Sequence, residues 1–529
     1  SSQDSTAFFF IRNERGRERS RPLFVRRHMY YPDLETFKKL TREGNLIPVY
    51  REILADVETP VTALSKLAAK SHVFLLESVE GNEKWGRFSF LGADPQLIFR
   101  VSGAEVIISN NGSIRRFRHG GDPLRHLQAL LQKYRPIAVT GLPRFYGGAV
   151  GYLGYGMVRY FEKLPVRAAD DLGTDEAVFL LTDTILVFDN VRHTIKIVAC
   201  AFVDEKDGVT PEASYREATA KIDRIMEDLQ ERAPSLPPAG PAPADGEIAI
   251  SPNMTAEAFR EMVRKAKDYI LNGDIIQAVL SQRFAVENSF APLHLYRALR
   301  FINPSPYLFF FKAGETILIG SSPEVLVRLE EGVAELRPIA GTRRRGGTEQ
   351  EDRKMADELL QDPKEKAEHV MLVDLGRNDL GRIARTGSVQ VNQLMAVERY
   401  SHVMHLVSHI QAQLEAGKDA FDVIRAAFPA GTLSGAPKIR AMEIIEELEP
   451  HQRGPYGGAV GYFSYTGNMD FGITIRTMLL KNNRIYIQAG AGIVADSDPE
   501  TEYRETQSKA AGMLRAIRLA ASNFELMDL

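Results

Sequence analysis

A seven-residue segment, YGGAVGY, occurs twice in this chain of 529 residues, at positions 146–152 and 456–462. A weaker match pairs FLGADP at 90–95 with LIGSSP at 318–323, in the same order relative to the first repeat. Two matching segments in the same order indicate an internal duplication rather than chance. We therefore expect the two halves of the chain to share one structural plan.

The chain is expected to divide near its middle, at a segment rich in proline and alanine. Five prolines fall within residues 233–243, a density that a regular helix or an inner strand does not tolerate. The chain also exceeds the size at which one hydrophobic core usually stops growing. We expect the arginine-rich residues 1–28 to form a flexible extension, residues 29–232 one domain, residues 233–250 a linker and residues 251–525 a second domain.

Hydrophobic periodicity predicts a mixture of helices and strands. Residues 257–270 and 356–373 carry apolar side chains at helical spacing, whereas residues 484–488 alternate between polar and apolar side chains as a strand does. Both copies of the repeat place small residues in an aromatic-flanked run, which suits a strand that another backbone approaches closely. This mixture favours an α+β fold with sheets of some size.

The charge balance and the single cysteine narrow the classes of partner and compartment. With 66 basic and 69 acidic residues the formal net charge is −3, so no excess points to nucleic acid, and an anionic substrate must be held locally. No stretch approaches the roughly 20 apolar residues of a membrane span. Cys200 cannot form an internal disulfide, and it follows an apolar run, so we expect it to be buried rather than nucleophilic. Without a signal-peptide pattern, a cytoplasmic location is expected.

Glutamates near the C-terminus stand at the spacing of one helix face. Glu502, Glu505 and Lys509 share that face on a helix that the Asp-Pro pair at 498–499 is expected to begin. Two carboxylates and an ammonium can bind a hard cation and, beside it, an anionic ligand group. Taken alone, however, such a pattern is more typical of a solvated charge network.

A second pair of glutamates, Glu365 and Glu368, repeats the same spacing. Two such pairs favour a Mg2+ site with oxygen ligands. A carboxylate-bridged di-iron site would need a glutamate three residues before His369, where Lys366 stands. Zinc is disfavoured because the sequence has neither cysteine pairs nor a His-Glu-x-x-His motif.

Several other segments offer groups for ligand binding without choosing a ligand. Residues 337–347 place Gly341 and Thr342 in an expected loop, whose backbone amides could meet a carboxylate, although the arginines around them are typical of a solvated turn. Small residues at 490–492 follow an expected strand and could let a ligand reach main-chain N–H groups, or simply form a tight turn. Spacing does not choose among three histidines: His402, His405 and His409.

Together these segments resemble the chorismate-utilising enzymes, from about residue 251 to about residue 520. The resemblance rests on GSSPE at 320–324, PIAGT at 338–342, EHVMLVDL at 368–375, RND at 377–379, PAGTLSGAPK at 429–438 and the helix containing Glu502. It implies an internally duplicated fold of large antiparallel β-sheets with flanking helices. It also implies a Mg2+-dependent lyase that acts on chorismate.

The resemblance assigns roles residue by residue. Glu368 and Glu505 would ligate Mg2+, with Glu365 and Glu502 nearby, directly or through water. Glu324 would be the general acid that protonates the leaving hydroxyl, His405 would act in the elimination step, and Thr432 would lie close to the ring carboxylate. The substrate would be held by Gly341, Thr342, Tyr456, Arg476, Gly490, Ala491, Gly492 and Lys509.

Two positions place the sequence within this family. Gln277 stands where isochorismate and salicylate synthases have a lysine that activates water, so water is a less favoured nucleophile. Ala340 stands where aminodeoxychorismate synthases typically have a lysine able to attack ring carbon C2. Direct attack by ammonia is favoured, as in the large subunits of anthranilate synthases. An aminodeoxychorismate synthase and a catalytically silent tryptophan-binding scaffold remain the alternatives.

That branch of the family implies a partner and an inhibitor. Ammonia would come from glutamine through a separate amidotransferase subunit, because Cys200 lacks the setting of a nucleophile elbow. The segments LLES at 75–78 and NPSPYL at 303–308 resemble the tryptophan feedback site of anthranilate synthases. The inhibitor would contact residues of both segments, namely Glu77, Ser78, Asn303, Pro306, Tyr307 and Leu308.

Overall fold

The computed structural model describes residues 30–78, 86–110, 112–204, 208–232, 248–400 and 403–525. The expected extension at 1–28, residues 233–247 of the expected linker and His402 lie outside these ranges. Among the described residues, none of the helices combines the length and the apolar character that crossing a membrane requires.

Two large sheets, each of 12 strands with antiparallel pairing, form the centre of the fold. Sheet A has the order β1 (Leu46–Leu54), β10 (Thr194–Phe202), β9 (Thr184–Asp189), β3 (Phe88–Ala93), β2 (His72–Glu77), β13 (Tyr307–Ala313), β14 (Thr316–Ser322), β23 (Thr477–Lys481), β24 (Arg484–Ile493), β12 (Gln277–Glu287) and β11 (Ile250–Pro252), with β20 (Gly435–Ala436) paired to β12. Sheet B has the order β17 (Ile339–Arg344), β19 (Val403–Gln413), β16 (Val333–Leu336), β15 (Val325–Glu330), β22 (Met469–Ile473), β21 (Ala459–Ser464), β7 (Gly148–Leu153), β8 (Ala177–Thr182), β4 (Leu97–Ser102), β5 (Glu105–Asn110) and β6 (Ser113–Arg118), with β18 (Gln390–Arg399) paired to β19.

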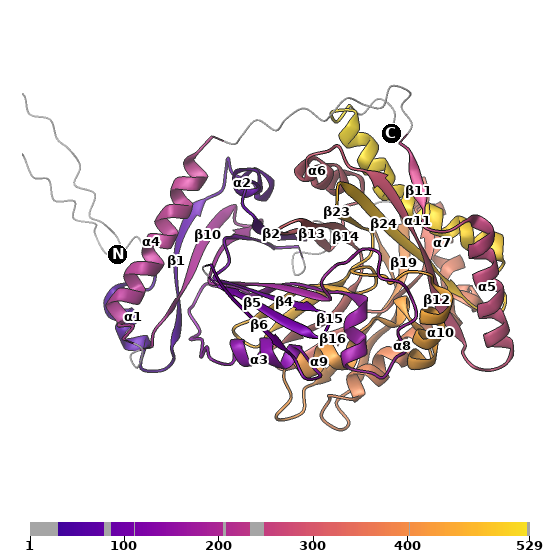
Figure 1. The fold of residues 1–529 in the computed structure, drawn as a ribbon, viewed down its shortest axis with the longest axis horizontal. Coiled ribbons are helices and arrows are strands. Elements are labelled where there is room, and N and C mark those ends of the chain that lie inside the picture. The colour runs from indigo at the N-terminus through magenta and orange to yellow at the C-terminus, as the bar shows by residue number, and fades with distance from the viewer. Residues whose placement is uncertain are drawn as a thin grey trace, which may run out of the picture.

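Helices flank both sheets, which confirms the predicted α+β fold class. They are α1 (Leu34–Leu40), α2 (Pro60–Leu67), α3 (Leu124–Leu131), α4 (Pro211–Gln230), α5 (Ala256–Leu271), α6 (Pro292–Ile302), α7 (Glu349–Gln361), α8 (Pro363–Gly381), α9 (Ala420–Ala427), α10 (Lys438–Leu448) and α11 (Pro499–Ala521), with the 3-10 turns η1 (Tyr155–Tyr160) and η3 (Gly431–Leu433). In Figure 1 sheet A runs through the upper part of the molecule, and β4, β5, β6, β15 and β16 of sheet B lie below it.

The duplication predicted from the repeats appears as a local two-fold arrangement. The two copies form β7 and β21, which pair directly with Gly151 opposite Gly461. Both glycines are required, because an added Cβ would lie 1.9 Å from Val178 O at Gly151 and 2.0 Å from Asp470 O at Gly461. In sheet A the weaker repeat lies in β3 and β14, which flank the central β2 and β13 pair on either side. Strands from both halves of the chain thus enter each sheet, while the division into two domains stays a prediction.

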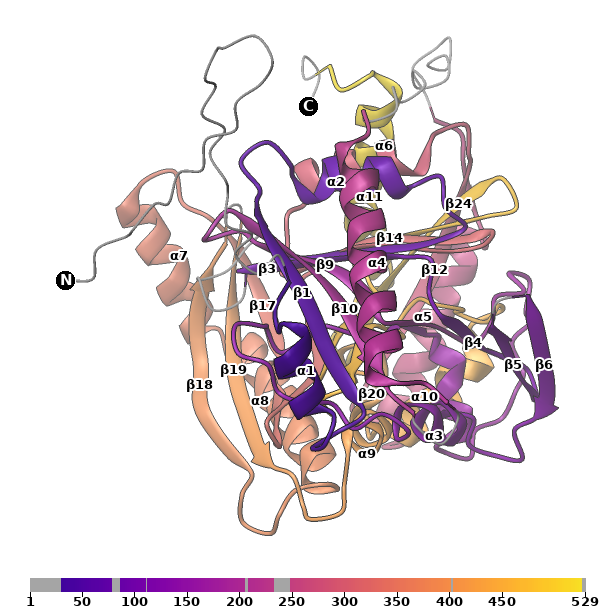
Figure 2. The same ribbon diagram turned by 90° about the vertical axis from the view of Figure 1, so that its left-hand side faces the viewer.

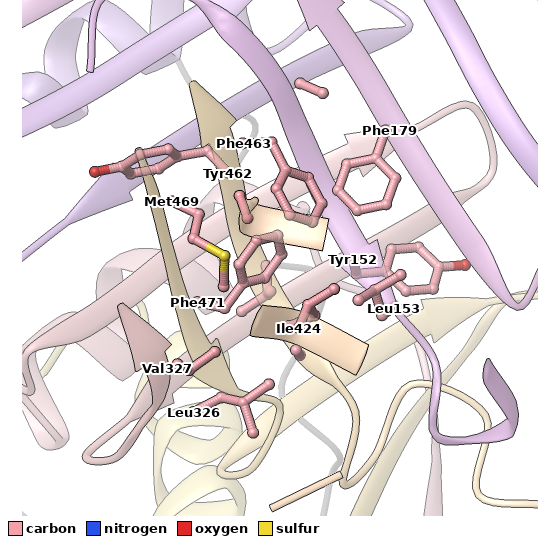
Figure 3. Packing of buried hydrophobic residues seen from close by; sticks show 14 of the residues in the cluster. Tyr152, Leu153, Phe179, Leu326, Val327, Ile424, Tyr462, Phe463, Met469 and Phe471 are labelled. Carbon is pink, nitrogen blue, oxygen red and sulfur yellow. The ribbon is translucent and has the colours of Figure 1, made fainter. Parts of the chain in front are cut away.

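Two clusters of buried side chains hold these layers together. Alternate residues of β2 face opposite sides, with Val73 and Leu75 in one cluster and Phe74 in the other. The first cluster joins sheet A to α4, α6 and α11, and the second joins both sheets to α3, α8 and α9. Figure 2 shows α4 lying across β1 and β10 of sheet A. Figure 3 shows the second cluster, where Phe463 of β21 contacts Phe471 of β22 at a ring-centroid distance of 4.8 Å.

Two of the helix predictions were confirmed, and one was wrong. The helix expected at 257–270 is α5, and α11 begins at Pro499 with Asp498 as its N-cap, as expected. The single helix expected at 356–373 is wrong, since α7 ends before Asp362 and α8 begins at Pro363. Asp362 accepts hydrogen bonds from two backbone amides of α8, and a proline at the first helical position needs no amide donor.

Two segments that were expected to lie outside strands are parts of strands. Residues 339–344 form β17, and residues 490–492 lie inside β24, which runs well beyond the predicted 484–488. Glycines made both segments look like turns, although small residues also suit strands that other atoms approach closely. Cys200 lies buried in β10, as expected, and burial raises the pKa of its thiol well above the usual value.

Candidate active site

Glu324 lies between β14 and β15, and its carboxyl group is buried. The residue is only 8% exposed, and its Oε1 accepts a hydrogen bond from Thr432 Oγ1 at 3.1 Å. Burial raises the pKa of Glu324 to about 8, against smaller lowering effects of Thr432 and Lys509. A carboxyl group with this pKa is protonated at neutral pH and can donate a proton.

His405, on β19, is held by the neighbouring strand β17. Its Nδ1 lies 2.9 Å from Gly341 O and 3.1 Å from Thr342 Oγ1. A proton on Nδ1 would be donated to the carbonyl oxygen, which leaves the Nε2 lone pair free. Burial lowers the pKa of His405, so the ring is neutral at neutral pH and can accept a proton. His409 instead faces Glu335 at 3.7 Å.

The four glutamates expected at the metal site come from two helices whose carboxylates influence one another. Burial raises the pKa of Glu368 on α8, and the negative charges of Glu365 and Glu505 raise it further. Burial also raises the pKa of Glu502 on α11, with a further contribution from Glu505. The fold therefore brings the two pairs into one region, although they lie more than a hundred residues apart in the chain.

These carboxylates are held by cations of the chain itself. Arg343 Nη1 lies 3.1 Å from Glu365, and Lys509 Nζ lies 2.7 Å from Glu505. Within the described ranges, no group of three or more histidine, cysteine or acidic side chains is arranged closely enough to hold a metal ion as it stands. Arg343 was expected in a solvated turn, but it pairs with Asp362 as well, at 2.7 Å.

Strand β24 and helix α11 form a wall beside these groups. Lys509 Nζ donates to Gly490 O at 2.9 Å, and Arg476 Nη1 donates to Lys509 O at 3.3 Å. Gly490 leaves no room for a side chain, because an added Cβ would lie 2.8 Å from Tyr456 Oη. The Lys509 ammonium and the Tyr456 hydroxyl therefore both lie beside Gly490, where the ammonium could bind a carboxylate.

The neighbouring residues of β24 face in alternate directions. An added Cβ at Gly492 would lie 2.6 Å from Gln277 Nε2, which donates to Glu368 Oε1 at 3.4 Å. Gly492 and Gln277 therefore connect this wall to the carboxylates of α8. The methyl group of Ala491 is buried among side chains of α5, so this residue can serve the site only through its backbone.

A second pocket, apart from the candidate active site, is lined by residues of both sheets and not by Glu324. Five of the six residues expected to bind an inhibitor line it, namely Glu77, Ser78, Pro306, Tyr307 and Leu308. The hydroxyl of Ser78 is buried without a hydrogen-bond partner in the described part of the chain. Asn303 does not line this pocket and donates to Ser321 O at 3.4 Å.

Sequence reasoning named Tyr307 but missed three charged residues of this second pocket, Asp470, Arg328 and Arg144. Asp470 accepts hydrogen bonds from Tyr307 Oη at 2.7 Å, Arg328 Nε at 2.9 Å and Arg144 Nη2 at 2.9 Å. All four residues line the pocket. They come from segments far apart in the chain, and the only available signal was the position of Asp470 shortly after the second copy of the repeat.

Comparisons with known proteins cover most of the chain. The model of the chorismate binding enzyme family matches residues 72–515. The chain is 47% identical over 93% of its length to anthranilate synthase component 1 of Acetivibrio thermocellus, and covers 99% of that protein. Among solved structures, anthranilate synthase component I from Streptococcus pneumoniae TIGR4 is 39% identical, with a TM-score of 0.72 over 87% of this chain and 98% of that one.

A more distant structure shares the fold alone. The menaquinone-specific isochorismate synthase of Escherichia coli is 19% identical and superposes with a TM-score of 0.66, over 92% of this chain and all of that one. The matched family segment includes every glutamate of the two helices, the buried Glu324 and His405. From the extent of this match and the site that it encloses, the chain belongs to the chorismate binding enzyme family.

Proposed function

We propose that this protein is the large subunit of an anthranilate synthase, a lyase that converts chorismate and ammonia into anthranilate and pyruvate. The observation that carries the proposal is the buried Glu324 carboxyl group, which accepts a hydrogen bond from Thr432 and whose raised pKa keeps it protonated at neutral pH. The positive charge of Lys509, which pairs with Glu505, acts on the same carboxyl group. Relatives that cover almost the whole chain are named anthranilate synthase component 1, which supports the same activity.

The first step needs an acid because hydroxide is a poor leaving group. Ammonia adds to ring carbon C2 of chorismate, the double bonds shift, and the C4 hydroxyl leaves as water with the proton of Glu324. The raised pKa of Glu324 keeps that proton in place at neutral pH. Thr432 then donates to the carboxylate that remains, so the same hydrogen bond stabilises the product of proton transfer.

The second step needs a base. Removal of the C2 proton and loss of the enolpyruvyl group as pyruvate make the ring aromatic. We assign proton removal to His405, because its Nδ1 is held by Gly341 O and its lowered pKa keeps the ring neutral. Thr342, on the same side of the ring, helps to fix its orientation.

Mg2+ suits the carboxylates of α8 and α11. Glu368 and Glu505 would ligate it, with Glu365 and Glu502 close by, because hard oxygen donors match this ion. Burial raises the pKa of Glu368, and repulsion by Glu365 and Glu505 raises it further; a divalent cation would relieve this repulsion. When bound, Mg2+ would anchor the ring carboxylate of chorismate, while Arg476 and Lys509 would bind substrate carboxylates from the wall of β24.

The nucleophile is inferred from two positions. By the resemblance to other branches of the family, Ala340 in β17 stands where a covalent mechanism has an amine, and Gln277 in β12 stands where a water-activating base is found. A methyl group cannot attack, and an amide is not basic. Both favour ammonia over a protein nucleophile or water. The ammonia would come from a glutamine amidotransferase subunit, because the relatives are named as one component of an enzyme. Enzyme and partner would act in the cytoplasm.

Tryptophan is the inhibitor that we propose for the second pocket. The unpartnered hydroxyl of Ser78 offers a hydrogen-bond donor or acceptor, and Asp470 offers a carboxylate. Aromatic residues of both halves, including Phe90 and Tyr462, line the same space, which suits an aromatic ring. Glu77 would act indirectly, since its carboxylate accepts hydrogen bonds from Tyr296 and from Arg300 on α6.

Mass spectrometry of the products tests the proposal against its rivals. The purified chain is incubated with chorismate, Mg2+ and an ammonium salt, with and without tryptophan. We expect anthranilate, reduced when tryptophan is added. Accumulation of aminodeoxychorismate would favour the aminodeoxychorismate synthase alternative, and tryptophan binding without any conversion of chorismate would favour the silent scaffold.

A further inference from the structure

A buried ion pair contacts three parts of the structure that hold residues of the proposed active site. Arg453 and Glu449 are 3% and 4% exposed. Arg453 Nε lies 2.8 Å from Glu449 Oε2, and Nη2 lies 2.6 Å from Oε1, so the two groups meet in a bidentate arrangement. Neither residue belongs to the groups assigned above to substrate, metal or proton transfer.

The first part is the turn that contains Thr432. Arg453 Nη1 donates to Leu433 O at 2.6 Å, and Leu433 directly follows Thr432 in the η3 turn. Thr432 Oγ1 in turn donates to Glu324 Oε1. A displacement of the turn would therefore move the hydroxyl that supports the proposed acid.

The second part is β12, the strand that pairs with β24. Arg453 Nη2 donates to Val279 O at 2.7 Å, and Glu449 Oε1 accepts from both N and Oγ of Ser281 at 2.8 Å. Val279 lies opposite Gly492 in the sheet, and Ser281 lies opposite Gly490. The ion pair thus holds the strand directly behind the two glycines.

The third part is the aromatic ring of Tyr456. The Arg453 guanidinium lies 4.5 Å from the ring centre of Tyr155 and 5.7 Å from that of Tyr456. Tyr456 is the residue whose hydroxyl closes against Gly490. A planar guanidinium can stack on rings while its edge donates hydrogen bonds, which an ammonium cannot do.

We propose that Arg453 is a positioning residue for this reaction. With Glu449 it fixes the Thr432 turn, β12 and the Tyr456 ring in one arrangement, without touching the substrate. This inference rests on the proposed function. A merely structural role is the rival, because buried ion pairs are often no more stabilising than apolar replacements. The two roles differ in what happens to Glu324 when Arg453 is changed.

The substitution Arg453→Lys separates them. Lysine keeps the charge beside Glu449 but cannot reach both carbonyls and both rings. Thr432 then loses its fixed place, and its lowering effect on the pKa of Glu324 weakens. Because Glu324 acts protonated, the alkaline limb of the pH profile of kcat should move to higher pH, and kcat should fall about 10- to 100-fold. Thr432→Val should move the limb in the same direction, and the double variant should show no further shift.

A matched control lies nearby. Arg159 forms an ion pair with Glu446, at 3.0 Å. In the described part of the chain it makes no hydrogen bond or ring contact with Leu433 or Tyr456. Arg159→Lys should leave the alkaline limb and kcat at their wild-type values. If Arg453→Lys does not fold, Glu449→Gln, which keeps the shape and removes the charge, should shift the limb in the same direction by a smaller amount.

The outcomes are distinct. An unmoved alkaline limb in a folded Arg453→Lys protein, or a shift that adds to that of Thr432→Val, would overturn the inference. If the wild-type chain forms no anthranilate, the proposed function fails, and crystal structures of the wild-type and Arg453→Lys proteins then decide. The inference predicts that Thr432 Oγ1 leaves hydrogen-bond distance of Glu324 in the variant, and an unchanged distance near 3.1 Å would refute it.

Discussion

Replacing Glu324 by glutamine removes the proposed proton donor while preserving the shape of the side chain and an oxygen that can accept from Thr432. With a pKa of about 8, roughly ten of every eleven Glu324 carboxyl groups carry a proton at pH 7. At the usual value near 4.5, only about one in 300 would do so. Burial therefore increases the fraction of competent acid about 300-fold.

Loss of this acid should lower kcat by about 10²- to 10⁴-fold, the range typical of general acid catalysis. The wild-type profile of kcat should decline above about pH 8, where Glu324 loses its proton, and the residual activity of Glu324→Gln should lack that limb. The assay is anthranilate fluorescence at a fixed concentration of free ammonia, so that the rise of free ammonia with pH does not mask the limb.

The same substitution has a second effect that is independent of turnover. The folded pKa of Glu324 lies above its unfolded value, so stability is lost as the pH rises from about 4.5 to about 8. At pH 7 this loss is about 3 kcal/mol, from 2.5 pKa units at 1.36 kcal/mol each. Glutamine avoids it but must bury its own amide, which leaves a gain of roughly 1–2 kcal/mol. Denaturant titration should therefore find Glu324→Gln more stable than wild type at pH 8 and no more stable at pH 4.5. Full activity in this variant would refute the reasoning. So would a stability difference between variant and wild type that is the same at both pH values.

Three further substitutions test other parts of the account. Glu368→Gln should weaken Mg2+ binding at least about tenfold in calorimetry. Asp374→Asn, on the exposed side of the same helix, should leave the Mg2+ affinity unchanged. Equal Mg2+ affinities of Glu368→Gln and wild type would remove Glu368 from the metal site. Gly490→Ala places a Cβ 2.8 Å from the Tyr456 hydroxyl and should raise the KM for chorismate, whereas Gly512→Ala meets no atom within 4 Å and should not. Ser78→Ala should weaken tryptophan inhibition about fivefold or more while sparing turnover, through loss of one buried hydrogen bond, and an unchanged inhibition curve would count against the second pocket.

The sequence was most informative where a local pattern has one structural solution. The repeated YGGAVGY segment implied a duplication, and in both copies the second and third glycines meet backbone atoms of a neighbouring strand. Asp498 and Pro499 marked the start of a helix correctly because capping is a local interaction. The same rule applied to Asp362 and Pro363 would have divided the helix expected at 356–373.

Other features depend on contacts that no local pattern contains. Glycine-rich strands look like turns, and only the tertiary structure shows why a side chain is excluded at Gly341. Its backbone is left-handed, and an added Cβ would lie 2.9 Å from Leu359 and 3.1 Å from Glu365. The pairing of Arg343 with Glu365 depends on how β17 meets α8. Arg453 and Glu449 stand four residues apart and resemble a surface pair, whereas their burial and their contacts with Leu433 come from the tertiary fold.

The most direct test of the proposed function is the stoichiometry of its products. Chorismate, Mg2+ and an ammonium salt are added to the purified chain, and anthranilate fluorescence and pyruvate are followed together. The account predicts one pyruvate for each anthranilate, with no reaction when the metal is chelated. Formation of isochorismate, or of an aminated product that keeps its enolpyruvyl group so that no pyruvate is released, would contradict it. Turnover that persists without a divalent cation would contradict it as well.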